Sequence, residues 1–145
     1  MLKRAKNASS LDEVVVHLLH RASQRADDMF VEEVGEADLT PRQFAVLLSV
    51  AESEKPSQTD LVEITGIDRS TLADLVARLI KKDLLKRSRS RQDARAYIVQ
   101  LTESGRQALA SAKKNARRAD TSLLARLPGE DRRSFVEALR VLSAE

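Results

Sequence analysis

The segment 57–101 constrains the fold of this 145-residue chain more than any other part of the sequence. Its central residues carry apolar side chains at helical spacing, namely Leu72, Leu75, Val76, Leu79 and Ile80. This spacing predicts an amphipathic helix, and Asp68 stands where it can cap the first N–H groups of that helix. A shorter apolar segment precedes it and ends at Gly66. A short helix, a turn with glycine and a longer helix are typical of a helix-turn-helix.

A basic hairpin is predicted directly after this helix. Tyr97, Val99 and Leu101 alternate with other residues as in a half-buried strand, and a polar tip rich in arginine precedes them. Between residues 78 and 95, eight Lys or Arg accompany two Asp, whereas the whole chain carries a net charge of only +3. Such a concentration of positive charge is typical of a nucleic-acid site. The alternative is a solvated basic hairpin that has no partner.

The helix, the hairpin and the residues after them resemble the core of the MarR-type transcriptional regulators. The resemblance rests on the recognition helix, on Asp93-x-Arg95 near the tip of the basic wing, and on the Leu-Thr-x-x-Gly motif that begins at Leu101. It implies a mainly α fold: a winged helix-turn-helix with a two-stranded β wing and N- and C-terminal dimerisation helices. We therefore expect one MarR-like domain over 1–145, with dimerisation helices in 9–34 and 103–145 and the winged helix-turn-helix in 40–101.

Two residues depart from the pattern of that family. Asp83 stands where a glycine commonly ends the recognition helix, and aspartate tolerates a left-handed backbone better than most non-glycine residues. Asp74 stands where a polar or basic residue commonly faces DNA. A carboxylate repels phosphate but accepts a hydrogen bond from the amino group of cytosine, so Asp74 alters the base readout that the family pattern implies.

Cap patterns predict where the first helices begin. The pairs with this spacing are Ser10 with Glu13, Thr40 with Gln43, and Ser57 with Asp60. The first helix is expected to span roughly 12–33, and Pro41 supports the start of the second. The long helix after the wing carries Ala112, Ala116 and Ala119, which indicates close helix packing. Because the terminal helices cannot bury their apolar faces alone, we expect a homodimer that binds two half-sites of palindromic double-stranded DNA.

Candidate DNA contacts follow from the polar face of the recognition helix, from the helix start at 57–59 and from the basic wing. They are Ser57, Thr59, Arg69, Ser70, Thr71, Asp74, Arg78, Lys81, Arg87, Arg89, Arg91 and Arg95. Ser70, Thr71, Asp74 and Ala77 are expected to approach base edges in the major groove, while Arg69, Arg78 and Lys81 flank them towards phosphates. The wing arginines Arg89, Arg91 and Arg95 are expected to lie in or along the minor groove. The resemblance implies that Asp93 ties down a wing arginine and sets the shape of the tip.

The resemblance also implies a small-molecule effector, which in the family is often an aromatic carboxylate or a relative of one. His17 and His20 stand on the first helix beside Arg21, and with Phe44 they are the candidates for an effector pocket. A half-exposed position of the histidines at the dimer interface is an equally favoured alternative. A metal site would need further ligands beside this pair, and the sequence offers no cysteine and no carboxylate at matching spacing.

The composition narrows the function further. The sequence has no cysteine, which excludes a disulfide scaffold and fits the cytoplasm, and no apolar run approaches the roughly 18 residues of a membrane span. No nucleophile elbow or phosphate-binding loop occurs, so we expect no enzymatic activity and no cofactor. The sequence predicts a dimeric, sequence-specific DNA-binding transcriptional regulator, a repressor released from its operator by a small aromatic acid or thioester. The alternative is a winged-helix module for protein interaction or RNA binding without operator recognition.

Overall fold

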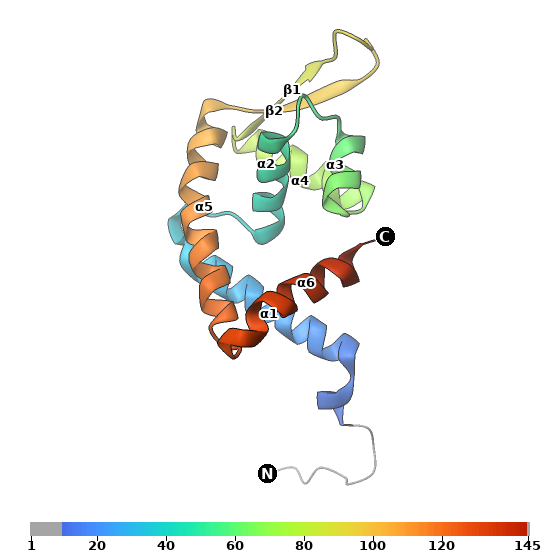
Figure 1. The fold of residues 1–145 in the computed structure, drawn as a ribbon. Helices are drawn as coiled ribbons and strands as arrows, with labels where there is room; N and C mark the ends of the chain where they lie inside the picture. The colour runs from blue at the N-terminus through green and yellow to red at the C-terminus, as the bar shows by residue number, and fades with distance from the viewer. Residues whose placement is uncertain (1–9, 145) are drawn as a thin grey trace.

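The computed structural model describes residues 10–144, so the predicted dimerisation segments 9–34 and 103–145 each extend one residue outside the described range. The architecture is mainly α with one antiparallel pair of strands (Figure 1), which confirms the predicted fold class. The elements in chain order are η1 (Leu11–Glu13), α1 (Val15–Val34), η2 (Gly35–Ala37), α2 (Pro41–Glu52), α3 (Gln58–Thr65), α4 (Arg69–Lys81), β1 (Leu85–Arg89), β2 (Tyr97–Leu101), α5 (Glu103–Leu124), η3 (Gly129–Asp131) and α6 (Arg132–Ser143).

The winged helix-turn-helix lies at one end of the molecule, with the hairpin of β1 and β2 projecting from it (Figure 1). Its interior is aliphatic, as the shortage of aromatic residues requires. The largest fully buried side chains all belong to this unit: Val46, Leu47, Leu61, Leu72, Val76, Leu79, Leu85 and Val99. Burying such a side chain stabilises a fold by about 1.5–3 kcal/mol, so this end of the chain holds the main core.

Side-chain caps fix the helix starts in this unit, as the sequence predicts. Thr40 Oγ1 accepts the backbone N–H of Gln43 at 3.2 Å, and Gln43 Oε1 accepts the N–H of Thr40 at 3.1 Å. Ser57 and Asp60 exchange the equivalent pair of bonds at the start of α3. Asp68 Oδ1 accepts a backbone N–H in the first turn of α4 at 2.9 Å. These bonds satisfy donors that the helix itself leaves free, and they define where each helix begins.

The predicted start of the first helix is wrong. Leu11–Glu13 form a 3₁₀ turn, and α1 begins only at Val15, after an extended Val14 with a ψ of 104°. The Glu13 N–H donates to the backbone carbonyl of Ser10 at 2.7 Å, so the Ser10 hydroxyl instead accepts the N–H two residues along, at 3.4 Å. A capping box between Ser10 and Glu13 therefore does not form.

The Leu-Thr-x-x-Gly motif joins the end of α4, the wing and the start of α5. Thr102 Oγ1 donates to the carbonyl of Asp83 at 2.5 Å and accepts the N–H of Gly105 at 2.9 Å. The Thr102 N–H donates to the carbonyl of Leu84 at 3.2 Å. A Cβ on Gly105 would lie 2.0 Å from that same Leu84 oxygen, so only glycine permits this approach. Asp83 has a φ of +58°, the left-handed conformation expected at the end of the helix.

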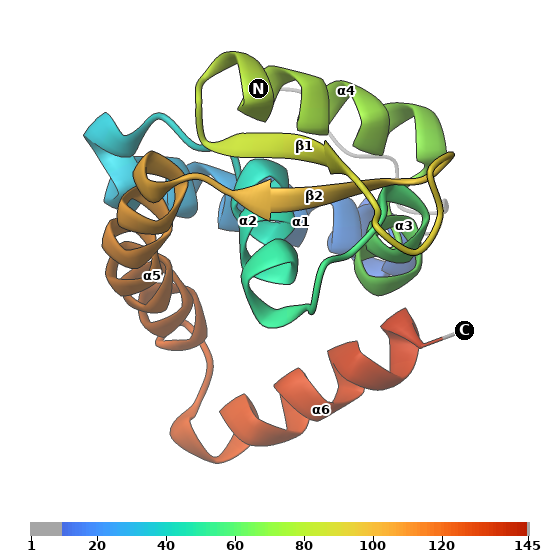
Figure 2. The same cartoon turned by 90° about the horizontal axis from the view of Figure 1, so that it is seen from above.

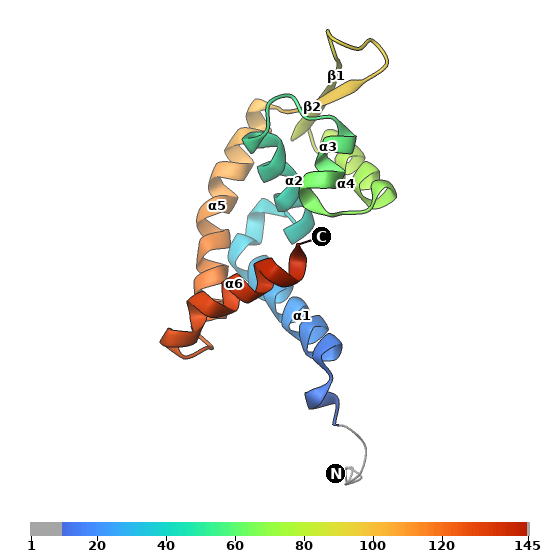
Figure 3. The ribbon, with the colours of Figure 1, turned by 45° about the vertical axis from the view of Figure 1, so that its right-hand side comes forward.

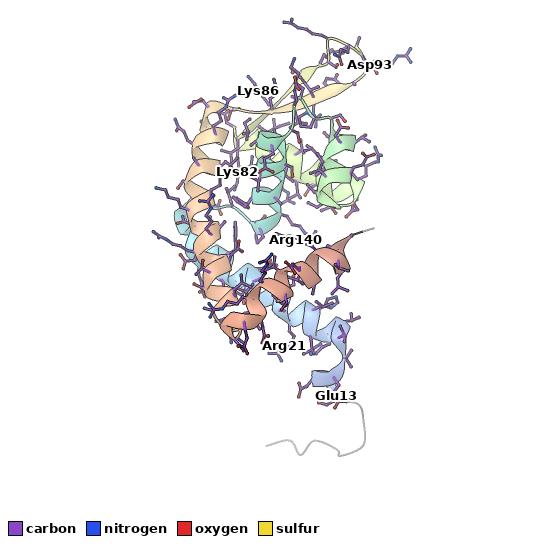
Figure 4. The ribbon with its side chains drawn as sticks, in the orientation of Figure 1. Glu13, Arg21, Lys82, Lys86, Asp93 and Arg140 are labelled. Carbon is purple, nitrogen blue, oxygen red and sulfur yellow. The ribbon has the colours of Figure 1, made fainter. Side chains whose placement is uncertain are left out.

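Two longer-range contacts hold the winged unit together, and neither was predicted. The Val99 N–H of β2 donates to the Pro56 carbonyl at 2.8 Å, and an isolated β-bridge pairs Ser57 with Ile98. The segment before α3 therefore pairs briefly with β2 as a short third strand-like segment of the sheet. Lys82, which is labelled in Figure 4, lies just after α4. Its Nζ donates to the Asp38 carbonyl at 2.7 Å and lies 3.2 Å from Asp38 Oδ2, which ties the end of α4 to the corner after α1.

The terminal helices form the other end of the molecule. α5 packs most extensively along α1, and its buried residues Ala112, Ala116 and Ala119 permit the close packing that the sequence predicts. α6 stands apart from the rest of the ribbon in Figure 2, and within residues 10–144 its substantial contacts are with η3 alone. Among the described residues, no helix combines the length and the apolar character that crossing a membrane requires.

Apolar side chains remain exposed on the terminal helices. The N-terminal half of α1 projects away from the winged unit (Figure 3). The large exposed apolar residues of η1 and α1 are Leu11, Val14, Val15, Val16, Leu18, Leu19 and Val31, and those of α6 are Val141 and Leu142. Within residues 10–144, a single chain thus leaves large apolar side chains exposed on both terminal helices, which is typical of an interaction surface.

Candidate nucleic-acid interface

One face of α4 is exposed, polar and opposite the buried face. This is the face that the helical spacing predicts for contact with DNA. The exposed residues of α4 are Arg69, Ser70, Asp74, Ala77, Arg78 and Lys81, whereas Thr71 is partly buried. Viewed from above, α4 lies along the outside of the unit beside β1 (Figure 2). A helix with small and polar side chains on its outer face fits the major groove, which is about 12 Å wide.

An ion pair lies near the middle of this face. Asp74 Oδ2 and Arg78 Nε are 2.8 Å apart, at the i, i+4 spacing that brings side chains together on a helix. The carboxylate at the position that departs from the family pattern is therefore paired with an arginine of the same helix.

The first turn of α4 is held by Asp68. Its carboxylate accepts hydrogen bonds from the side chain and backbone of Thr71 and from the hydroxyl of Ser70, and these bonds lower the pKa of Asp68 to about 2. The group is thus ionised at neutral pH. Two predicted DNA contacts, Ser70 and Thr71, consequently have their hydroxyl groups oriented by the cap.

Two arginines meet the start of α3. Arg87 Nη2 of the wing donates to Gln58 Oε1 at 2.6 Å, and Arg69 Nη1 of α4 donates to Thr59 Oγ1 at 3.4 Å. The structure therefore brings the predicted residues of α3, α4 and β1 together around one helix start. Gln58 was not predicted, although it stands between two candidates, because its contact with the wing is non-local. Positive charge beside free helix N–H groups is the arrangement that binds a phosphate.

Asp93 bonds to a wing arginine at the tip of the hairpin. Its Oδ1 accepts the backbone N–H of Arg95 at 2.9 Å, so it holds the main chain of that arginine. The Arg89 guanidinium donates to the Ala94 carbonyl at 3.3 Å, and Ser90 Oγ accepts the N–H of Asp93 at 3.3 Å. Figure 4 shows Asp93 at the far end of the hairpin. These bonds define the tip and leave the Arg91 and Arg95 side chains exposed.

Tyr97 supports two of the wing arginines. The guanidinium carbons of Arg87 and Arg89 lie 5.9 Å and 5.6 Å from the centre of its ring. Tyr97 is 45% exposed, unlike the buried Val99 of the same strand, because it lies towards the tip. Cation–π contacts of this kind contribute about 0.5–1 kcal/mol at exposed sites. This role was not predicted, although the alternation of the strand puts Tyr97 beside the basic residues.

A hollow with a volume of about 850 Å³ lies between the wing and the segment before α3. Its lining residues are Glu54, Lys55, Ser88, Arg89, Ser90, Arg91, Gln92, Ile98 and Gln100. Most of these side chains are polar or positively charged, so the surface continues the basic character of the wing around its base.

The candidate effector residues do not come together within one chain. His17 is partly buried, His20 and Arg21 are exposed on α1, and Phe44 packs against Phe30 with ring centres 5.4 Å apart. Along α1, the histidines lie about 15–20 Å from Phe30 at 1.5 Å per residue. Figure 4 shows Arg21 on the arm of α1 that projects from the molecule. Within residues 10–144, no group of three or more His, Asp or Glu is placed to hold a metal ion.

Comparisons with known proteins agree with this architecture. The sequence model of the MarR family matches residues 37–96. The chain is 37% identical to the HTH-type transcriptional repressor NicR of Pseudomonas putida over 93 residues, which cover 64% of this chain and 59% of NicR.

Two solved structures extend the similarity to nearly the whole chain. BpsR of Bordetella bronchiseptica, whose DNA binding is regulated by 6-hydroxynicotinic acid, is 31% identical with a TM-score of 0.88, over 96% of this chain and 99% of BpsR. The repressor CouR, bound to a 23-mer DNA duplex, is 31% identical with a TM-score of 0.87, over 98% of this chain and 100% of CouR. Since sequence, wing and terminal helices all correspond, this chain belongs to the MarR family of winged helix-turn-helix transcriptional regulators.

Proposed function

We propose that two copies of this chain form a homodimer that represses transcription from a palindromic operator and leaves it when a small acid binds. The observation that carries the DNA-binding part is the exposed polar face of α4, flanked by the arginine-rich wing and by the arginines at the start of α3. These three features lie on one unit and offer groups for bases, for phosphates and for the minor groove.

In this function α4 enters the major groove. Ser70 and Asp74 approach base edges, while Arg69 and Lys81 flank them towards phosphates. Arg78, which the sequence directs towards phosphates, is held beside Asp74 and in this proposal joins the residues that approach base edges. Ser57 and Thr59 stand at the start of α3, where backbone N–H groups and Arg87 meet a phosphate oxygen. Arg89, Arg91 and Arg95 follow the backbone and the minor groove beside it. The operator complex of CouR supports this assignment, because that similar chain is bound to a DNA duplex.

The exposed apolar residues of α1 and α6 support the homodimer. A monomer in water would leave the row from Leu11 to Leu19 uncovered, together with Val141 and Leu142 of α6. Pairing of two copies through these segments covers both rows and sets two α4 helices side by side. Two such helices read half-sites about one DNA turn apart.

The effector part of the proposal rests on charge and on the similarity to BpsR. His17, His20 and Arg21 offer positive or hydrogen-bonding groups for a carboxylate, and Phe44 offers an aromatic face. Because these groups are far apart in one chain, the dimer has to bring α1 of one subunit towards Phe44 of the other. An aromatic acid or its thioester would then release the operator by binding more tightly to the spacing of α4 helices that does not fit DNA.

An electrophoretic mobility shift at increasing salt tests the DNA-binding part. We expect a duplex selected from a random pool to bind with a logarithmic salt slope of about −0.9 per phosphate contact. Weak binding with a flat slope would favour the interaction module, and preference for single-stranded or duplex RNA would favour the RNA-binding alternative.

Thermal shift with a panel of aromatic acids and thioesters tests the effector part, with 6-hydroxynicotinic acid as the first probe. Arg21→Ala is expected to leave DNA affinity within a few fold and to abolish release by the ligand. Arg25→Ala, which removes another exposed arginine one turn along α1, is the matched control and keeps the response. Loss of DNA binding and release together in Arg21→Ala would instead indicate a packing role.

A further inference from the structure

We infer that Asp74 is a positioning residue that holds Arg78 so that the free end of its guanidinium reads a guanine in each half-site. The inference rests on the proposed DNA-binding function and specifies how α4 distinguishes bases. The two side chains meet at 2.8 Å on the face of α4 that points away from the core. They are 60% and 67% exposed, so the pair faces solvent and is open to a docked duplex.

The atoms used by the ion pair decide what Arg78 can still bind. Asp74 Oδ2 accepts from Nε, and this is the hydrogen bond of the Arg78 side chain among the described residues. The guanidinium is planar with five N–H donors in a fixed fork, so a bond at Nε orients the whole group and leaves the terminal Nη1 and Nη2 free. Two parallel N–H donors match O6 and N7 of guanine, which is the commonest specific contact of arginine in the major groove.

Holding the arginine before DNA arrives also lowers the cost of binding. A free arginine side chain samples many rotamers, and ordering it on a base opposes association. With Nε fixed by Asp74, fewer rotamers remain to be lost when the guanine is met. The pair therefore favours a base that accepts two hydrogen bonds from a fixed direction over a phosphate, which any rotamer of a free arginine can reach.

The negative charge of Asp74 also favours binding of the preferred base over binding of DNA of any sequence. It is the only acidic residue within α4, where a lone carboxylate would repel the DNA backbone. Paired with Arg78, it cancels the charge that the arginine would otherwise contribute to binding of any sequence. Its second oxygen, Oδ1, only accepts hydrogen bonds, so it suits the amino group of a neighbouring cytosine or adenine and disfavours O6 or O4.

The pair is not needed to hold the helix together. Exposed ion pairs at i, i+4 spacing contribute little to stability, and α4 is already held by its buried face and by the Asp68 cap. Another exposed ion pair joins Glu103 and Arg106 on α5 at 3.5 Å. Substitution of Glu103 removes the same charge from a comparable pair outside the recognition helix, which makes it a matched control.

The test begins with selection of duplexes from a randomised pool by the full-length wild-type protein. Affinities are then measured on the selected duplex and on duplexes in which each guanine of the half-site is replaced in turn. Wild type is expected to prefer guanine at one position per half-site by about 5- to 150-fold, and Arg78→Ala to lose that preference. Asp74→Ala is expected to lower it about fivefold while affinity for unrelated duplex stays the same or rises. Asp74→Asn keeps more of it, because the amide oxygen still accepts from Nε.

Two comparisons separate positioning from simple charge. The double variant Asp74→Ala with Arg78→Ala is expected to match Arg78→Ala in its lack of guanine preference, since a positioning residue adds no preference once its target is gone. Glu103→Ala is expected to keep the guanine preference. If Asp74→Ala raises affinity for all sequences equally and keeps the preference, Asp74 only repels phosphate and the inference is overturned. If wild type selects no sequence from the pool, the proposed function fails, which is a different result.

Discussion

Replacing Gly105 with alanine tests the junction between α4, the wing and α5. The added Cβ would lie 2.0 Å from the Leu84 carbonyl oxygen and 2.9 Å from its carbon, whereas close carbon–oxygen contacts are about 3.3 Å or longer. The backbone must therefore move by more than about 1 Å, and the Thr102 N–H bond to the same oxygen is lost or weakened.

The expected magnitude follows from three effects. Overpacking costs about 1–3 kcal/mol, and a clash with backbone belongs at the upper end of that range. Loss of the hydrogen bond costs about 1 kcal/mol. The higher helix propensity of alanine returns about 1 kcal/mol. The net destabilisation is about 3 kcal/mol, which lowers the melting temperature of a chain of this size by roughly 6–12 °C.

The assay is urea and thermal unfolding followed by circular dichroism at one fixed protein concentration. Gly129→Ala is the matched control, because no atom lies within 4 Å of its added Cβ, and its stability should change by no more than about 0.5 kcal/mol. We also expect Gly105→Ala to weaken DNA binding, since Leu84 leads directly into β1. If Gly105→Ala unfolds at the same urea concentration as wild type or a higher one, the close approach at this junction is not a constraint and the reasoning is refuted.

Three further predictions concern the wing, the dimer and the helix cap. Arg95→Ala should cost roughly 1–3 kcal/mol of DNA affinity per subunit, more on A·T-rich flanks, without change in helical content; if the variant binds both A·T-rich and G·C-rich flanked duplexes as tightly as wild type does, the wing does not read DNA. Light scattering should find a dimer at micromolar concentration, and truncation from Pro128 should give aggregates, whereas a stable folded monomer would contradict the dimer. Because the pKa of Asp68 is lowered from 3.8 to about 2, its contribution to stability is present above pH 3.8 and is lost as the pH falls towards 2, so Asp68→Asn should unfold with a smaller change of midpoint between about pH 5 and pH 2.5.

The features that could be predicted from the sequence depend on neighbours within a few residues. The exposed and buried faces of α4, the cap at Asp68 and the left-handed Asp83 follow from helical spacing and from backbone preferences. Each of these features depends on residues within one or two helical turns, so contacts with distant parts of the chain did not change it. The Ser10 capping box failed for a local reason as well, because a 3₁₀ bond already satisfied the Glu13 N–H.

The features that could not be predicted join residues far apart in the sequence. Gln58 meets Arg87, Pro56 bonds to β2, and Lys82 bonds to Asp38, and no spacing rule relates these partners. The contact of Asp93 with a backbone N–H depends on the conformation of the wing tip, which residue types alone do not define. The sequence therefore predicts which residues belong to a site built from several elements. Only the folded structure shows how these residues contact one another.

The contact between Lys82 and Asp38 fixes one end of α1, so a small rotation there moves the other end of this long helix by a few ångströms. Asp38 follows the corner where α1 ends, and the contact with Lys82 fixes that corner to the residue that directly follows α4. The 20 residues of α1 form an arm about 30 Å long, so a rotation of about 5° at the corner displaces the far end by about 2.6 Å. That displacement is most of the spacing of about 3.4 Å between successive base pairs. In the proposed dimer, a pivot of a few degrees between the paired α1 helices and the winged units would change the spacing of the two α4 helices by a comparable distance, while each winged unit keeps its internal structure.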